Sequence, residues 1–272
     1  PSIDPAAPKQ AMEAAPARSC PELLARLRIA VASGDPKAAK AELLESIRRD
    51  RALAFAILDE AEREWDTRGL DILFETLEDS GAMADRSGQT RLLGLAGAAR
   101  TPGHQRHALA LLEGILSPDD PGTLTSEVLA LARILMRYAG DPSLRGDAVN
   151  VLAPFADRPE VMRELRELAT DGSDPAVNVR REALAVCVER GTPVDAALCV
   201  DLLEFERDPR LARLATQGLI YMAPRGLGDR VVPALEQRIA QAGNEADLPL
   251  LLFGLVRFAP QRAAPELRRA LD

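Results

Sequence analysis

Hydrophobic residues recur along this chain with the three- and four-residue spacing of amphipathic helices. In the segment 51–65, for example, Leu53, Ile57, Leu58 and Trp65 fall on one stripe, which assigns Trp65 to the core. From residue 20 onward the pattern predicts about fifteen short helices separated by two to six residues, the spacing of antiparallel neighbours. The predicted segments are 21–33, 36–49, 51–65, about 70–77, 89–99, 103–116, 126–138, 142–156, 159–170, 175–190, 193–206, 209–222, 228–242, 245–258 and 261–271.

Proline and glycine fall mostly between these apolar segments, where they end helices. Asp35 is expected to cap the second helix and Pro36 to open it. The run 92–97, rich in leucine and small residues, predicts a close approach of two helices. The repeating unit is therefore a helical hairpin.

An Asp-Pro pair introduces three of the later helices, at steps of 33 and 34 residues, which lies in the range of tandem helical repeats. The pairs are Asp141-Pro142, Asp174-Pro175 and Asp208-Pro209. Each is followed by a similar core pattern: Leu144, Arg145, Ala148 and Leu152, then Val179, Arg180, Ala183 and Leu184, then Leu211, Ala215 and Leu219. Asp is expected to cap each helix, and the small Ala to let it pack tightly against its partner.

The stretch from Asp174 to Leu184, DPAVNVRREAL, resembles the second-helix motif of HEAT repeats at its Asp, Pro, Val, Arg and Ala positions. The resemblance implies an all-α fold, a right-handed α-α superhelix (α-solenoid, armadillo-like) of about seven HEAT-like hairpins. A single domain is expected over residues 20–272, behind a flexible Pro/Ala-rich leader over residues 1–19.

In the HEAT family the Asp and Arg of successive repeats form a ladder along the array, so the resemblance gives Asp174 and Arg180 structural roles. The other two copies depart from the motif. Arg145 comes two residues early in the first copy, and in the third Ala212 replaces the Arg, with Arg210 and Arg213 on either side. Outside residues 141–222 the likeness rests on the hairpin rhythm, which tetratricopeptide-like or irregular hairpins share.

Composition fits this picture, because 47% of the residues are hydrophobic but only 3% are aromatic, so the core must consist of Leu, Ala, Val and Ile. The net charge of −8 disfavours general binding to nucleic acid. Cys20, Cys187 and Cys199 are too few and too irregularly spaced for a disulfide or zinc scaffold. Reduced core thiols are expected, and a bridge between Cys187 and Cys199 stays open.

Chemistry-bearing motifs are sparse, and we predict no catalytic, cofactor-binding or metal-binding residue. His104 and His107 could share a helix face, but no further ligands lie nearby in the sequence, so solvated surface histidines are expected. Neither a P-loop nor a dinucleotide-binding glycine motif occurs. Gly226 to Gly228 is interpreted as a turn between repeats, and the apolar stretch 248–258 as a core helix rather than a membrane span.

The predicted function is a non-catalytic scaffold or adaptor that binds a protein or peptide along a concave surface. Seven outward-pointing residues of the Asp-Pro helices are the candidates for partner binding: Arg145, Asn150, Asn178, Arg181, Arg213, Gln217 and Tyr221. Arg181 and Tyr221 are the preferred anchors, because Arg and aromatic residues dominate interface energetics.

Two alternatives remain. An enzyme of the HEAT-like DNA glycosylase or chromophore-lyase type would share the helical class, although the acidic chain and its sparse aromatics disfavour a glycosylase. A structural module tethered through a segment upstream of Pro1 is the other. A cytoplasmic location is expected, and such an upstream signal or anchor would imply a periplasmic or membrane-tethered one.

Overall fold

The computed structural model describes residues 19–61, 65, 67–98, 101–116, 124–222, 226–242 and 246–271. Within them the chain forms fifteen α-helices and one short 3-10 turn, and no strand. The predicted all-α class is confirmed. The expected leader falls almost entirely on residues 1–18, which lie outside the described residues.

Contacts between helices divide the chain into two compact units, residues 1–88 and 89–272. The expectation of one domain over residues 20–272 stays a prediction.

The first unit holds α1 (Cys20–Ser33), α2 (Lys37–Arg49), α3 (Ala52–Ala61) and α4 (Thr67–Ser80). Each of these helices contacts the other three. Their shared core consists of aliphatic side chains that are 0–2% exposed: Leu27, Leu43, Ile47, Ile57, Leu73 and Leu77. The first unit is therefore a small four-helix cluster.

Trp65 lies beyond the end of α3 rather than on its stripe, which differs from the prediction. Its ring is half-buried, and the Arg28 guanidinium lies 4.8 Å from the ring centroid. Trp65, which the helical stripe had assigned to the core, thus makes a cation–π contact with Arg28.

The second unit contains most of α5 (Arg86–Ala98) and ten further helices. These are α6 (Pro102–Ile115), α7 (Thr125–Tyr138), α8 (Pro142–Leu152), α9 (Pro159–Thr170), α10 (Val177–Arg190), α11 (Pro193–Phe205), α12 (Pro209–Met222), α13 (Gly228–Ala242), α14 (Leu248–Phe258) and α15 (Pro260–Leu271), with a 3-10 turn at Ala153–Phe155.

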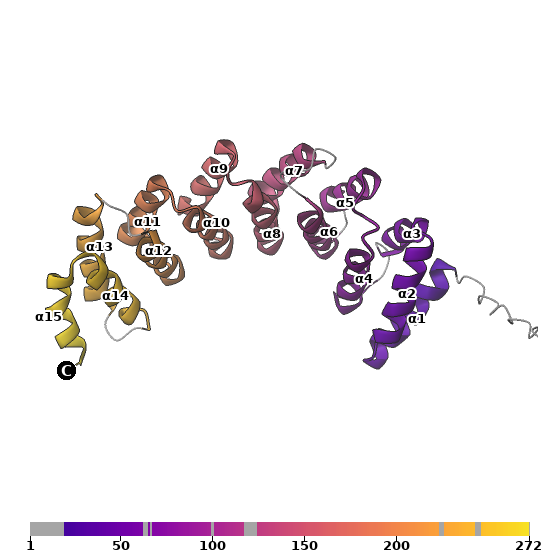
Figure 1. Ribbon diagram of the computed structural model, residues 1–272, viewed down its shortest axis with the longest axis horizontal. Helices are drawn as coiled ribbons and strands as arrows, with labels where there is room; N and C mark the ends of the chain where they lie inside the picture. The colour runs from indigo at the N-terminus through magenta and orange to yellow at the C-terminus, as the bar shows by residue number, and fades with distance from the viewer. Residues whose placement is uncertain are drawn as a thin grey trace, which may run out of the picture. The chain divides into compact units, whose positions relative to one another are not determined.

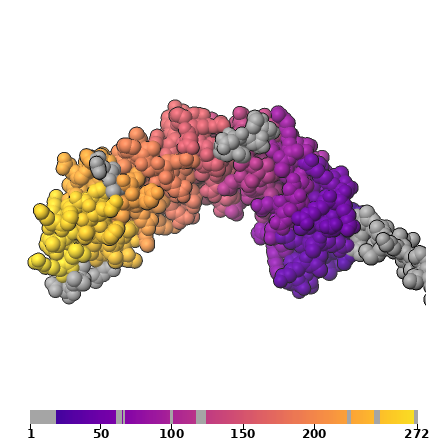
Figure 2. Space-filling model, viewed as in Figure 1, coloured from indigo at the N-terminus to yellow at the C-terminus, as the bar shows by residue number. Residues whose placement is uncertain are grey.

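Consecutive helices of this unit pack as the pairs α7–α8, α9–α10, α11–α12 and α13–α14. The second helices of the pairs also contact one another, α6 with α8, α8 with α10, α10 with α12 and α12 with α14, so they form one continuous layer. Figure 1 shows this layer as one row of helices and the first helices as a second row. Side chains fill the spaces between the ribbons (Figure 2). This is the arrangement of an α-solenoid.

The core pattern after each Asp-Pro pair is confirmed. Ala148, Ala183 and Ala215, on α8, α10 and α12, are each 0% exposed. Because each second helix contacts the second helices on both sides, a larger side chain at these positions would meet a neighbouring helix.

Helix starts follow the prediction only in part. Asp141 caps α8 by accepting the backbone N–H groups of Ser143 and Leu144, as expected. Asp174 instead accepts from the N–H of Ala176, and α10 begins only at Val177. Pro36 likewise precedes α2 rather than opening it.

Two further expectations needed correction. The segment predicted over 142–156 ends as an α-helix at Leu152, because Pro154 cannot donate the next helical hydrogen bond. The contact between helices expected in the run 92–97 occurs at Gly97, where a Cβ would lie 3.5 Å from Leu131 Cδ1, but not at Gly94, where a Cβ would meet nothing within 4 Å. A tight approach occurs at Gly218 instead, where a Cβ would lie 2.6 Å from Val188 Cγ2.

Other local predictions hold. Gly226 has φ +85° in the turn before α13, and α14 packs against α12, α13 and α15. No helix among the described residues has both the length and the apolar character that crossing a membrane requires.

Candidate functional site

An open polar hollow of about 230 Å³ lies on the exposed face of α6, α8 and α10. It contains three of the seven residues predicted to bind a partner, Asn150, Asn178 and Arg181. The residues that line it are Arg106, Pro142, Ser143, Gly146, Asp147, Asn150, Asn178, Val179, Arg181 and Glu182. Three neighbouring helices, α6, α8 and α10, therefore present their polar groups to the same hollow.

The charged groups of the hollow form ion pairs. Arg106 Nε donates to Asp147 Oδ2 at 2.6 Å, and the Arg181 guanidinium lies 3.0 Å from Glu182 Oε1. Both arginine side chains are nearly half exposed, at 47% and 43%. The lining charges balance, so the hollow offers hydrogen-bond donors and acceptors rather than a strong field.

Three further predicted residues lie on α12 and do not line the hollow. Arg213, Gln217 and Tyr221 are all exposed and are spaced by four residues, which places them on one face of the helix. Tyr221 is 75% exposed. Since α12 packs against α10, this stripe belongs to the same layer as the hollow.

Arg145 does not point outward, and the orientation predicted for it is wrong. Its side chain is 14% exposed. The guanidinium donates from Nε to the carbonyl of Met136 at 2.8 Å and from Nη1 to Asp174 Oδ1 at 3.0 Å, while Nη2 donates to Asp174 Oδ2. Arg145 therefore joins consecutive hairpins instead of offering its charge to a partner.

Similar ion pairs connect the following hairpins. Arg180, which is 4% exposed, donates to Glu206 in the turn after α11. The Arg213 guanidinium lies 3.2 Å from Asp247 Oδ1, just before α14. Asp174 and Arg180 thus join consecutive hairpins, the kind of role that the resemblance to HEAT repeats implied.

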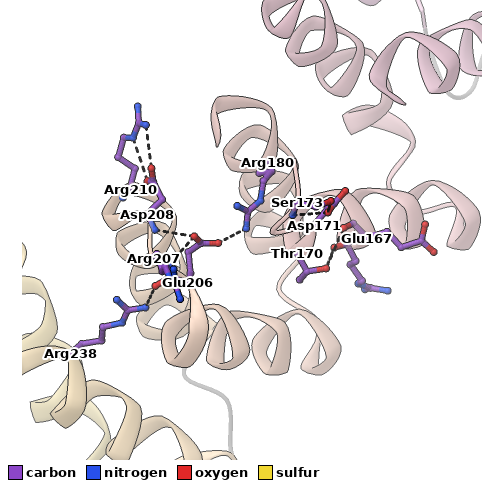
Figure 3. A network of polar contacts seen from close by, with 11 residues as sticks. Glu167, Thr170, Asp171, Ser173, Arg180, Glu206, Arg207, Asp208, Arg210 and Arg238 are labelled. Carbon is purple, nitrogen blue, oxygen red and sulfur yellow. Dashed lines mark hydrogen bonds and ion pairs between the residues drawn. The ribbon is translucent and has the colours of Figure 1, made fainter. Parts of the chain in front are cut away.

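The acceptor for Arg180 is a residue that sequence reasoning missed. Glu206 accepts the backbone N–H groups of Arg207 at 2.8 Å and Asp208 at 2.9 Å as well as the Arg180 guanidinium (Figure 3). Asp208, the residue at the expected position, pairs with its neighbour Arg210 instead. No feature of the motif around Asp208-Pro209 distinguishes Glu206 as the partner.

The pKa values of these carboxyl groups reflect the pairing. The Arg145 guanidinium is the largest influence on Asp174 and holds the pKa of that carboxyl below its usual value. Burial raises the pKa of Glu206, but the N–H of Asp208 and the Arg180 guanidinium lower it more, so the net pKa is also depressed. Both carboxylates are therefore charged at neutral pH.

The two histidines occupy different environments, contrary to the prediction that both are solvated. His104 is 7% exposed, and its Nδ1 is hydrogen-bonded to the Oγ1 of Thr101, which precedes α6. His107 Nδ1 lies 2.7 Å from the carbonyl oxygen of Gly103. Nowhere in the described part of the chain do three His, Cys, Asp or Glu side chains gather as a metal site would need.

A second pocket, of about 270 Å³, lies where α11, α12, α13 and α14 meet. Its polar lining includes Arg207, Arg213, Arg238 and Asp247. Sequence reasoning identified only Arg213, because the other groups come from a turn and from helices without the Asp-Pro motif. The segment 207–238 contains six arginines, but the sequence gives no sign that three of them converge on one pocket.

Comparisons of the chain with protein-family models, with curated proteins and with solved structures give no match.

Proposed function

We propose that the protein is a non-catalytic scaffold that binds a protein or peptide across the exposed face of α8, α10 and α12. One observation carries the proposal: Asn150, Asn178 and Arg181 line a single open hollow, and the adjoining helix exposes Arg213, Gln217 and Tyr221. Six of the seven predicted residues thus lie on one helical layer, in positions that a partner can reach.

The chemistry of this face suits a polypeptide. Side-chain amides such as Asn150 and Asn178 carry both a donor and an acceptor, and so can pair with the N–H and C=O of a peptide bond. Tyr221 adds a large, rigid and mostly exposed ring of the type that anchors interfaces. The paired charges in the hollow favour no particular sign of ligand.

Rigid support favours binding as well. The Arg145–Asp174 and Arg180–Glu206 pairs join the hairpins that carry the face. Holding α8, α10 and α12 in register reduces the entropy lost when a partner settles across them.

We further propose that the second unit is of the HEAT type and that the complete array is a right-handed superhelix of about seven hairpins. The support is the Asp-Pro series together with the ion pairs between consecutive hairpins.

The test compares two double variants in capture of proteins from an extract of the source cells. The first, Arg181→Ala with Tyr221→Ala, removes both preferred anchors. The control, Arg163→Ala with Phe205→Ala, removes an arginine and an aromatic residue from α9 and α11, where the side chains are 68% and 77% exposed.

Quantitative mass spectrometry of the captured proteins is the readout. The anchor variant should retain a specific partner about tenfold less than wild type, because two hot-spot side chains are lost, whereas the control should retain it normally. The proposal fails if no protein is enriched over empty beads or if both variants retain the partner equally.

A further inference from the structure

The pocket between α11, α12, α13 and α14 joins apolar walls to a cationic rim. Leu203, Leu250 and Leu251 contribute to its walls. Among the described residues, Arg207, Arg213 and Arg238 also line it, together with one acidic residue, Asp247. The described residues of the pocket therefore carry a local excess of positive charge, in a chain whose net charge is −8.

Arg238 is held in place by the main chain. Its Nη2 donates to the carbonyl of Glu206 (Figure 3). Its Nε donates to the carbonyl of Leu203 at 2.6 Å, so Arg238 satisfies two acceptors at the end of α11. These two bonds leave Nη1 without a partner among the described residues. The Glu206 carboxylate also acts on Arg238 through its charge, but it is already paired with Arg180, so Arg238 remains a cation of the pocket.

The guanidinium groups of Arg207 and Arg213 are available to bind a ligand. Arg213 is 53% exposed, and its one ion pair among the described residues is with Asp247, at 3.2 Å. The Arg207 side chain is exposed, and within the described ranges its guanidinium makes no ion pair or hydrogen bond. Both side chains are exposed, so a ligand carboxylate can pair with them without first breaking a buried ion pair.

We propose that this pocket binds a carboxylate next to an apolar group, and specifically the acidic side chain of a partner segment whose adjacent apolar side chain enters the pocket. The acidic segment rests on the proposed function, which supplies a polypeptide on the neighbouring face of α12. Guanidinium groups match the two oxygens of a carboxylate. The apolar walls and the carboxylate of Asp247 disfavour a hydrated phosphate dianion.

Salt screening makes the local charge compatible with the acidic chain. At physiological ionic strength the Debye length is about 8 Å, so distant carboxylates contribute little inside the pocket. The arginines at its rim dominate the attraction felt by an acidic group that enters.

The probe for the test is 4-methylpentanoate, which joins a carboxylate to a branched apolar chain, and 4-methylpentanamide is its uncharged control. Titrations of the whole chain are followed in ¹⁵N–¹H spectra. We expect saturable shifts at Leu203, Arg207 and Leu250 with the acid. The amide should bind about tenfold more weakly, since a charge-assisted contact is lost.

Arg207→Gln is the informative variant, because its side chain bonds to nothing in the described fold and its loss should leave the structure intact. It should weaken binding of the acid about tenfold, while Arg163→Gln, on α9, should not. Equal binding of acid and amide, shifts confined to other regions, or an unchanged affinity in Arg207→Gln would overturn the proposal.

The two proposals fail separately. If a partner is captured but Arg207→Gln weakens neither its retention nor the binding of the acid, the pocket assignment is wrong and the scaffold function stands. If the acid binds through Arg207 and no partner is captured, the scaffold function is wrong and the acidic segment is excluded as the source of the carboxylate.

Discussion

The Arg145 guanidinium faces the Asp174 carboxylate with two parallel hydrogen bonds, across 29 positions of the sequence. Arg145 belongs to α8, and Asp174 lies in the turn that leads to α10. The side chains are 14% and 6% exposed. This bidentate pair connects two consecutive hairpins and is little exposed, at the wall of an open hollow of about 580 Å³.

Replacing one member of the pair should destabilise the protein. We expect Asp174→Asn to lower the free energy of unfolding by about 3 kcal/mol at pH 7, because the Arg145 charge stays buried without its counter-ion. Urea unfolding followed by circular dichroism measures the change. Asp157→Asn is the matched control, since Asp157 also pairs with an arginine but is 82% exposed. Equal losses in both variants would show that burial does not strengthen the Arg145–Asp174 pair.

The same pair should make stability depend on pH. Arg145 depresses the pKa of Asp174 in the folded protein below the value of about 3.9 expected when unfolded. The contribution is therefore complete above pH 4 to 5 and is lost as the pH falls through the folded pKa. The stability difference between wild type and Asp174→Asn should be constant from pH 7 to pH 5 and shrink below about pH 4. A difference that changes between pH 7 and pH 5 would contradict this assignment.

Two glycine substitutions should act in opposite directions. Gly218→Ala places a Cβ 2.6 Å from Val188 Cγ2 and 3.2 Å from Cys199 Sγ, and overpacking of this kind costs about 1–3 kcal/mol. Gly94→Ala, in the exposed middle of α5, meets nothing within 4 Å and should stabilise by up to about 1 kcal/mol through helix propensity. Thermal melts measure both. A stabilised Gly218→Ala variant would show that α10, α11 and α12 are less tightly packed than described.

The three thiols should differ in reactivity. Burial raises the pKa values of Cys187 and Cys199 to about 12, while Cys20 is only half-buried. Because the thiolate is the reactive form, iodoacetamide at pH 8 should label Cys20 first and the other two only after unfolding. Peptide mass spectrometry follows each site, with denatured protein as the control for equal labelling. Labelling of Cys187 in the native protein as fast as Cys20 would contradict its burial.

The sequence predicted features that depend on local pattern. Apolar spacing and the prolines identified the helices, and the core alanines Ala148, Ala183 and Ala215 followed from the Asp-Pro series. Contacts that depend on how adjacent hairpins are offset from each other could not be predicted. Whether Arg180 pairs with Glu206 or with Asp208 is decided by the three-dimensional offset between α10 and the turn after α11.

The candidate binding face was also predictable where it depends on local pattern and not where it depends on contacts between hairpins. The four-residue spacing of Arg213, Gln217 and Tyr221 correctly placed them on one exposed stripe of α12. The same reasoning predicted that Arg145 points outward, but its side chain turns inward to pair with the carboxylate of Asp174 on the next hairpin. Nothing within α8 itself distinguishes a free arginine from one engaged by the following repeat.

Site-specific photo-crosslinking tests the binding face most directly. A benzophenone amino acid replaces Gln217 on α12 and, in the control, Arg163 on α9, which is 68% exposed. After irradiation in the source cells, position 217 should give a discrete protein adduct that position 163 does not. Absence of an adduct at 217, or the same adducts from both positions, would contradict the account.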